Sequence, residues 1–155
     1  MVSPTVSPDG FPAFFAETEP RLRRALVAAY GPQRGREAAA EALAYGWQHW
    51  ERVSGMENPV GYLYRVGQSR TRPRLEPPLF PAPPERSDPW TEPELPAAFE
   101  SLSERERVAT ILIEGFGWTY REVAELIDVS ISSVQSYRER GLRKLRDVLG
   151  VTEDA

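Results

Sequence analysis

Nine of the 24 residues from Pro73 to Pro96 are proline, and no other feature of the sequence restricts the fold as strongly. Proline has no backbone N–H to donate, and it disfavours helical backbone in the residue before it. We therefore expect residues 73–96 to form an extended linker. This linker divides the chain into two units, at residues 11–72 and 97–150, with a short disordered lead (1–10) and a tail (151–155).

The unit before the linker is predicted to contain three helices. Apolar residues recur at helical spacing over about 12–30 and 34–53, and Gly31-Pro32 is a stop signal between them. Asn58-Pro59 is typical of a helix start, so a third helix is expected from there to before Pro73. The stripes predicted to face the core are Phe14, Phe15, Leu22, Leu26 and Tyr30, then Ala39, Leu43, Trp47 and Trp50, then Tyr62, Leu63 and Val66. No strand pattern of consequence is present, which favours an all-α fold.

The unit after the linker carries sharper helix boundaries. Ser103 with Glu106, and Thr119 with Glu122, have the spacing of a capping box, in which each side chain bonds the backbone of the other residue. A four-residue turn, Asp128 to Ile131, leads into a last helix that is capped by Ser130 and runs to about Leu149. This pattern predicts a helix-turn-helix over residues 119–145.

A helix-turn-helix binds DNA by laying the outer face of its second helix in the major groove. Val134, Gly141 and Leu145 are expected on the inner face of this helix. The opposite face presents side chains that can pair with base edges or phosphates, namely Ser132, Ser133, Gln135, Ser136, Glu139, Arg140 and Arg143. A helical hairpin with a solvated polar face is the alternative. Capping, turn length and apolar spacing agree with one another and favour the DNA-binding motif.

From Ser101 onward the sequence resembles the fourth domain of bacterial sigma factors. The residues that carry the resemblance are Leu102-Ser103-Glu104-Arg105-Glu106-Arg107, Trp118-Thr119-Tyr120-Arg121-Glu122-Val123-Ala124 and Arg140-Gly141-Leu142-Arg143-Lys144-Leu145-Arg146. The first unit resembles the second sigma domain through Glu41-Ala42, Trp47 and Asn58-Pro59-Val60-Gly61-Tyr62-Leu63-Tyr64-Arg65-Val66. Two such domains joined by a linker are similar to the extracytoplasmic-function (ECF) group of the sigma-70 family.

The resemblance implies a promoter-specificity subunit whose partners are core RNA polymerase and promoter DNA, with an anti-sigma factor as a further possible partner. The first unit would bind the clamp helices of the polymerase β′ subunit and the −10 element. The second would read the −35 element and contact the β flap. The outer-face residues of the last helix become −35 readers, and the backbone amides at Thr119, Tyr120 and Arg121 would suit a phosphate.

In the first unit, the implied −10 residues are Tyr62, Tyr64, Arg65, Gln68, Arg70 and Arg72, and the implied polymerase-binding residues are Glu37, Glu41 and Trp47. Aromatic side chains stack on exposed bases and arginines hold phosphates. Tyr62 and Tyr64 cannot both point outward from one helix, so one of them is expected in the core. The sequence departs from the family where the β′ grip forms, because Glu37-Ala38-Ala39-Ala40-Glu41 stands where an Asp-x-x-Gln pattern is common.

The length of the linker agrees with this assignment. At roughly 3.1 Å per residue, an extended chain over residues 73–96 reaches about 74 Å. Two turns of DNA span about 70 Å, from the roughly 34–36 Å length of one turn. The linker is therefore long enough to let two domains bind promoter elements that lie two turns apart.

The composition of the chain argues against several other classes of protein. The chain has no cysteine, carries a net charge of −4 and has a single histidine, His49, next to Trp50. There is no phosphate loop, nucleophile with a base, or cluster of metal ligands, so we expect neither an enzyme nor a cofactor. No apolar run approaches the roughly 20 residues of a membrane span, which favours a cytoplasmic protein without a membrane or small-molecule partner. The alternative function is a stand-alone helix-turn-helix regulator that does not engage polymerase.

Overall fold

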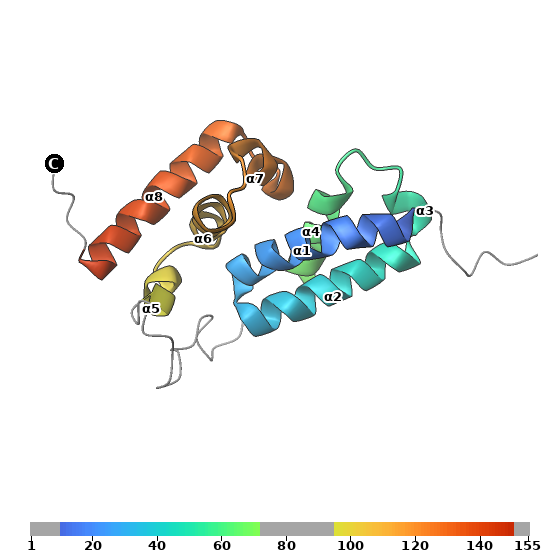
Figure 1. The fold of residues 1–155 in the computed structure, drawn as a ribbon, viewed down its shortest axis with the longest axis horizontal. Coiled ribbons are helices and arrows are strands. Elements are labelled where there is room, and N and C mark those ends of the chain that lie inside the picture. The colour runs from blue at the N-terminus through green and yellow to red at the C-terminus, as the bar shows by residue number, and fades with distance from the viewer. Residues whose placement is uncertain (1–9, 72–94, 151–155) are drawn as a thin grey trace, which may run out of the picture. The chain divides into compact units, whose positions relative to one another are not determined.

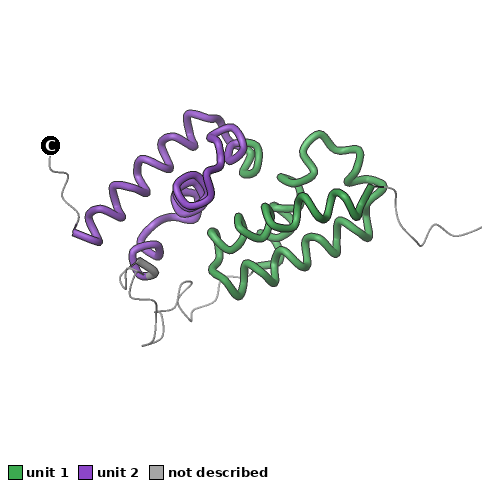
Figure 2. Tube along the Cα trace, viewed as in Figure 1, with its two compact units in different colours: residues 1–72, 125–128 green, residues 73–124, 129–155 purple. Residues whose placement is uncertain are grey.

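In the computed structural model, which describes residues 10–71 and 95–150, all regular structure is helical (Figure 1). The chain divides into two compact units, residues 1–72 with 125–128 and residues 73–124 with 129–155 (Figure 2). The predicted lead except Gly10, nearly all of the predicted linker, the tail and Arg72 lie outside the described residues. No helix in the described ranges is long and apolar enough to cross a membrane.

The first unit contains helices α1 (Phe11–Tyr30), α2 (Pro32–Gln48), α3 (Trp50–Val53) and α4 (Pro59–Arg70). Gly31 separates α1 from α2 with a positive φ of 87°, which suits glycine. Asn58 caps α4, because its side chain accepts a hydrogen bond from the Gly61 amide at 3.0 Å. Both boundaries were predicted from the sequence.

Two glycines of the first unit allow its helices to pack closely against α1. A β-carbon on Gly35 of α2 would overlap the backbone of Val27 in α1, and it would lie 2.7 Å from the carbonyl carbon of Leu26. Gly67 of α4 makes a similar approach to the Leu26 side chain. The core that results is built from Leu22, Ala25, Leu26, Ala29, Ala38, Ala42, Leu43, Leu63 and Tyr64.

The predicted helix over 34–53 is two helices. The backbone leaves the helical region at His49, with φ −119° and ψ 28°, and resumes in α3. The change of direction accompanies burial of Trp50 with Phe11 and Val53 in a small cluster. Two residues predicted to face the core are exposed instead, Phe15 by 43% and Trp47 by 40%.

The second unit contains α5 (Leu95–Glu100), α6 (Glu104–Thr110), the π-helical turn η1 (Ile111–Gly115), the first residues of α7 (Tyr120–Ile127) and α8 (Ile131–Leu149). The predicted capping box at the start of α6 is present in both directions. Neither α5 nor the π-helical turn was predicted. Helix α5 begins inside the segment that we expected to be linker, and Ala98 packs with Leu102 and Leu145 in a small cluster.

Candidate nucleic-acid interface

Local hydrogen bonds define the two helices of the motif. The amide of Thr119 donates to the Glu122 carboxylate at 3.0 Å, and the amide of Glu122 donates to the Thr119 hydroxyl, also at 3.0 Å. Asp128 takes a left-handed conformation, with φ 58°, in the turn between them. Ser130 then caps α8 by accepting from the Ser133 amide at 3.1 Å. The predicted turn and both predicted caps are therefore present.

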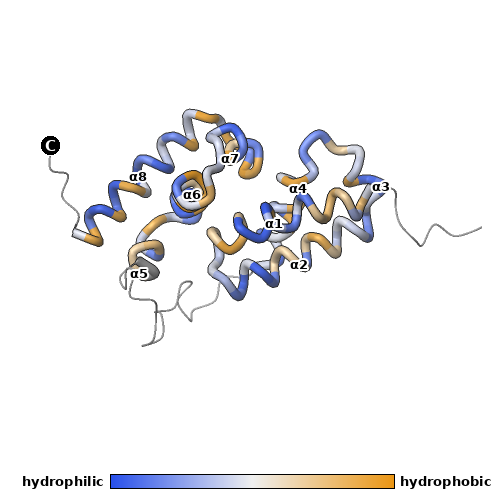
Figure 3. The backbone as a smooth tube through the Cα atoms, viewed as in Figure 1, coloured by the Kyte–Doolittle hydropathy of each residue, from blue (hydrophilic) through white to orange (hydrophobic). Residues whose placement is uncertain are grey.

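The inner face of α8 is set by Val134, Gly141 and Leu145, all of which are buried. Gly141 allows α8 to approach α6 closely, since a β-carbon there would meet the Thr110 hydroxyl and would lie 3.2 Å from the Glu106 carbonyl oxygen. Apolar bands interrupt an otherwise largely hydrophilic α8 (Figure 3). One side of α8 therefore packs in the core, and the other side is exposed to solvent.

The outer face of α8 consists of the residues predicted to read the −35 element. Six of these seven side chains are exposed, and Ser133 is half-buried beside the capping serine. The exposed ones are Ser132, Gln135, Ser136, Glu139, Arg140 and Arg143. They form a continuous polar surface on the second helix of the motif, in the position from which such helices enter the major groove.

Arg140 has neighbours that the sequence did not reveal. Its guanidinium carbon lies 5.3 Å from the centre of the Tyr137 ring, and its Nε lies 3.8 Å from Oε2 of Glu106. Arg105 donates to the Tyr137 hydroxyl at 3.0 Å. Arg105 and Glu106 belong to the first turn of α6. Because they are far from α8 in the sequence, these contacts could not be predicted from it.

Glu106 is ionised at neutral pH. Burial raises the pKa of its carboxyl, but the hydrogen bonds from Lys144 and the Ser103 amide, together with the charges of Lys144 and Arg140, outweigh burial and hold the pKa below its ordinary value. The carboxylate is therefore a fixed negative charge beneath the basic side chains of α8.

The predicted phosphate site at the start of α7 needs a correction. The amide of Thr119 is not free for a phosphate, because Glu122 accepts its hydrogen bond. The capping box was predicted from the sequence, and it uses the Thr119 amide that was also predicted to bind a phosphate. Arg121 is exposed and Tyr120 is half-buried, so their availability to a phosphate stays a prediction.

In the first unit, the choice between Tyr62 and Tyr64 is resolved by burial. Tyr64 is 1% exposed and belongs to the core, so it cannot stack on a DNA base as the sequence analysis allowed. Tyr62 is half-buried and packs on the cluster of Phe11, Trp50 and Val53. Of the other predicted −10 residues, Arg65 and Arg70 are exposed and Gln68 is half-buried, while Arg72 lies outside the described residues.

Tyr62 is part of a tyrosine–arginine cluster, which we define as Tyr45, Arg52 and Tyr62. The two phenol oxygens are 3.2 Å apart, and Arg52 donates to both of them. The Arg52 guanidinium carbon also lies 5.9 Å from the Tyr45 ring centre and 5.8 Å from that of Tyr62. Their shared hydrogen bond lowers the pKa of Tyr45 and raises that of Tyr62. Tyr45 and Arg52 were not predicted as site residues, because they come from α2 and α3 and meet Tyr62 only in the fold.

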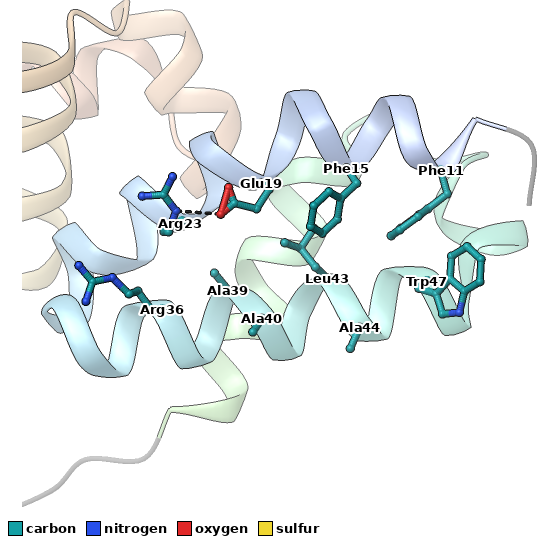
Figure 4. Close-up of a pocket in the computed structure, with 10 residues that line it drawn as sticks. All are labelled: Phe11, Phe15, Glu19, Arg23, Arg36, Ala39, Ala40, Leu43, Ala44 and Trp47. Atoms are coloured by element: carbon teal, nitrogen blue, oxygen red, sulfur yellow. Dashed lines mark hydrogen bonds and ion pairs between the residues drawn. The ribbon is translucent and has the colours of Figure 1, made fainter. Parts of the chain in front are cut away.

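An apolar groove lies between α1 and α2, with a volume of about 530 Å³. Phe11 and Phe15 of α1 face Leu43 and Trp47 of α2 across it, and alanines form part of the α2 side (Figure 4). At one end are the ion pair of Arg23 with Glu19, at 2.8 Å, and Arg36. The predicted polymerase-binding residues Glu37 and Glu41 are exposed on α2, and Trp47 lines the groove.

Replacement of Ser130 by alanine tests the local definition of α8. We expect the free energy of unfolding to fall by about 1 kcal/mol, because the Ser133 amide loses its acceptor at the helix start. Ser136→Ala is the control, since this exposed serine lies inside the helix. The measurement is chemical denaturation followed by circular dichroism. Equal stability of the two variants would contradict a capping role.

Comparison with known proteins agrees with the geometry. Residues 93–145 match the family model described as Sigma-70, region 4. The chain is similar in fold to the sigma factor RpoE in its co-crystal structure with the anti-sigma factor NepR from Bartonella quintana, with a TM-score of 0.65. The two sequences are 18% identical, and the match covers 92% of this chain and 98% of the other. No curated protein matches the chain. The predicted all-α fold is confirmed, and so is the predicted resemblance of the second unit to the fourth sigma domain, over residues 93–145.

Proposed function

We propose that this chain is a sigma factor of the ECF group, which binds core RNA polymerase and directs it to promoters. The proposal is supported by the match of residues 93–145 to region 4 of the sigma-70 family and by the likeness in fold to a sigma factor. The observation that carries the proposal is the exposed polar face of α8 within the segment that matches region 4. Polymerase supplies the catalytic chemistry in this role, and the protein acts in the cytoplasm, where polymerase and promoters are found.

The second unit would read the −35 element. Gln135, Ser136, Glu139 and Arg140 are exposed side by side on α8. Glutamine pairs with adenine, glutamate with cytosine and arginine with guanine in the major groove. Arg143 and Ser132 extend this surface, and Arg121 would hold a phosphate at the start of α7.

The first unit would hold the −10 strand. The tyrosine–arginine cluster offers aromatic rings for base stacking and a cation for phosphates, which are the two elements that single-strand binding requires. Arg65 and Arg70 are exposed on α4 and add positive charge to this domain. Gln68 is half-buried, so less of its side chain than of Arg65 or Arg70 is available to contact DNA.

The same unit would dock on the polymerase through α2 and the groove beside it. Phe15 and Trp47 expose large aromatic surfaces there, and exposed aromatic residues of this kind are enriched at the centres of protein interfaces. Glu37 and Glu41 supply carboxylates on the exposed side of α2. We propose that these residues contact the β′ clamp helices and that aromatic contacts replace some of the polarity that the family pattern would provide.

The function is tested by reconstitution. Purified chain is mixed with core polymerase, the complex is isolated by gel filtration, and transcription starts are mapped on genomic DNA fragments. A sigma factor forms a stoichiometric complex and starts transcripts only with core. A stand-alone regulator would bind duplex DNA without core and would not co-elute with it, and that result would refute the proposal.

Replacement of Tyr62 by leucine tests the −10 role of the first unit. We expect promoter opening to fall by about 5- to 150-fold, since stacking on an aromatic side chain is worth ~1–3 kcal/mol per base. Binding of the closed complex should be unchanged. The measurement is permanganate reactivity of thymines in the −10 region, compared with filter binding of the same complexes.

Tyr62→Phe is the matched control for this experiment. Phenylalanine keeps the ring but loses the hydroxyl that contacts Tyr45 and Arg52. If the ring stacks on a base, the phenylalanine variant opens promoters nearly as well as the native protein. Loss of opening in both variants would assign the effect to the hydrogen-bonded cluster instead.

A further inference from the structure

Glu106 lies beneath α8 with its side chain only 7% exposed, and both of its carboxylate oxygens are used. Oε1 accepts hydrogen bonds from the Ser103 amide at 3.0 Å and from Nζ of Lys144 at 2.7 Å. Oε2 lies 3.8 Å from Nε of Arg140. The residue therefore caps α6 and also pairs with two cations of α8, which is more than a capping box requires.

Arg140 is held from two sides. Glu106 pairs with its Nε, and the Tyr137 ring lies against its guanidinium at 5.3 Å. Tyr137 is itself fixed by the hydrogen bond from Arg105. Half of the Arg140 side chain remains exposed, at 50%. The ion pair involves Nε, and because half of the side chain is exposed, the terminal guanidinium nitrogens can still bond guanine O6 and N7.

This arrangement has two physical consequences. An unrestrained arginine side chain has a large rotamer entropy, and a side chain already held in one orientation loses less of it on binding. A carboxylate 3.8 Å away also reduces the attraction of Arg140 for phosphates, which depends on charge alone. Both consequences favour a directed contact with a base edge over a non-specific contact with the backbone.

We propose that Glu106 is a positioning residue that sets −35 specificity: it holds Arg140 over Tyr137 so that the guanidinium reads a base, and it keeps Lys144 from acting as a non-specific phosphate contact. The proposal rests on the proposed function, because it presupposes that α8 reads promoter DNA. Its partner is a guanine-containing major groove, and Glu106 itself touches no DNA.

The test compares Glu106→Gln with Glu104→Gln. Glutamine is accepted at the capping-box position, so the first substitution removes charge while keeping a capping side chain. Glu104 lies in the same first turn of α6, so the second substitution changes the net charge equally. Each variant is assembled with core polymerase and bound to a pool of duplex promoters randomised over the −35 element. Sequencing of the bound fraction then gives the preference at every position.

We expect Glu106→Gln to lower the preference for the favoured base at the Arg140 position by about tenfold, within the range of one bidentate contact. Glu104→Gln should leave that preference unchanged while raising binding to all sequences to the same small extent. In an Arg140→Ala background, Glu106→Gln should have no further effect on preference. A tenfold loss that persists without Arg140 would overturn the proposal, as would equal preferences in the two single variants.

Two further measurements keep the outcome unambiguous. If Glu106→Gln does not fold, Glu106→Asp replaces it, since the shorter carboxylate keeps the charge but moves away from Arg140, and an intermediate loss of preference is expected. In the free full chain, without polymerase, NMR relaxation of the Arg140 Nε–H group measures how strongly Glu106 restricts the motion of this side chain. Increased motion of Arg140 in Glu106→Gln supports the positioning role of Glu106, even if the chain fails to bind core polymerase. Unchanged motion overturns that role, whether or not the chain is a sigma factor.

Discussion

Replacement of Arg140 by alanine is expected to remove about 1–3 kcal/mol of discrimination at one position of the −35 element, which is about 5- to 150-fold in relative binding. The side chain is half exposed on the outer face of α8 and is held by Glu106 and Tyr137. A bidentate contact from a held guanidinium discriminates strongly, because a wrong base leaves its donors unpaired. The measurement is competition between promoters that differ in a single −35 base pair, using holoenzyme.

Arg121→Ala is the matched control for this prediction. Arg121 is an exposed arginine at the start of α7, where we expect a phosphate contact. Its loss should weaken binding to all promoters equally and should reduce the dependence of binding on salt. If Arg140→Ala also weakens all promoters equally, then Arg140 holds a phosphate and the assignment of a base contact is wrong.

Replacement of Gly35 by alanine is expected to destabilise the first unit by at least about 1–3 kcal/mol, the usual range for overpacking. The added methyl group would overlap the backbone of Val27, and backbone cannot move aside as a flexible side chain can. Alanine is the better helix former by ~1 kcal/mol, so a net loss means that the steric effect exceeds this gain. Because the unit is small, such a loss is a large share of its stability.

Gly55→Ala is the control for the steric explanation. A β-carbon at Gly55 would meet only the Arg52 carbonyl oxygen at 3.7 Å, which is ordinary contact. Thermal unfolding followed by circular dichroism and by tryptophan fluorescence is the measurement. We expect Gly55→Ala to unfold at nearly the native temperature and Gly35→Ala well below it. Equal melting temperatures would mean that α1 and α2 do not pack through Gly35.

The features that were predicted correctly from the sequence are local ones. The capping boxes of Ser103 and Thr119, the turn that begins at Asp128 and the Ser130 cap of α8 all depend on residues within a few positions of each other. Short-range hydrogen bonds and backbone preferences determine such features, so they can be predicted from the types of the residues involved. The exposed face of α8 was predicted for the same reason, because helical period alone separates it from Val134 and Leu145.

The features that were missed or left open depend on contacts between distant segments. Helical spacing could not choose between Tyr62 and Tyr64, and packing against other helices places Tyr64 in the core. The pairing of Glu106 with Arg140, and of Arg52 with Tyr62, joins residues of different helices. Trp47 was expected inside because it continues an apolar stripe, but the stripe extends beyond the surface that α1 covers, so Trp47 lines a groove.

The π-helical turn over Ile111–Gly115 has a consequence for protein engineering. A π turn holds one residue more than the corresponding α turn, and each helical residue rotates the chain by roughly 100°. A chimera that exchanged this segment for an uninterrupted α-helix of equal length would therefore deliver Trp118 with a different rotational phase. Grafts that transplant α7 and α8 to alter promoter choice should carry the π turn with them, so that the junction falls before Ile111.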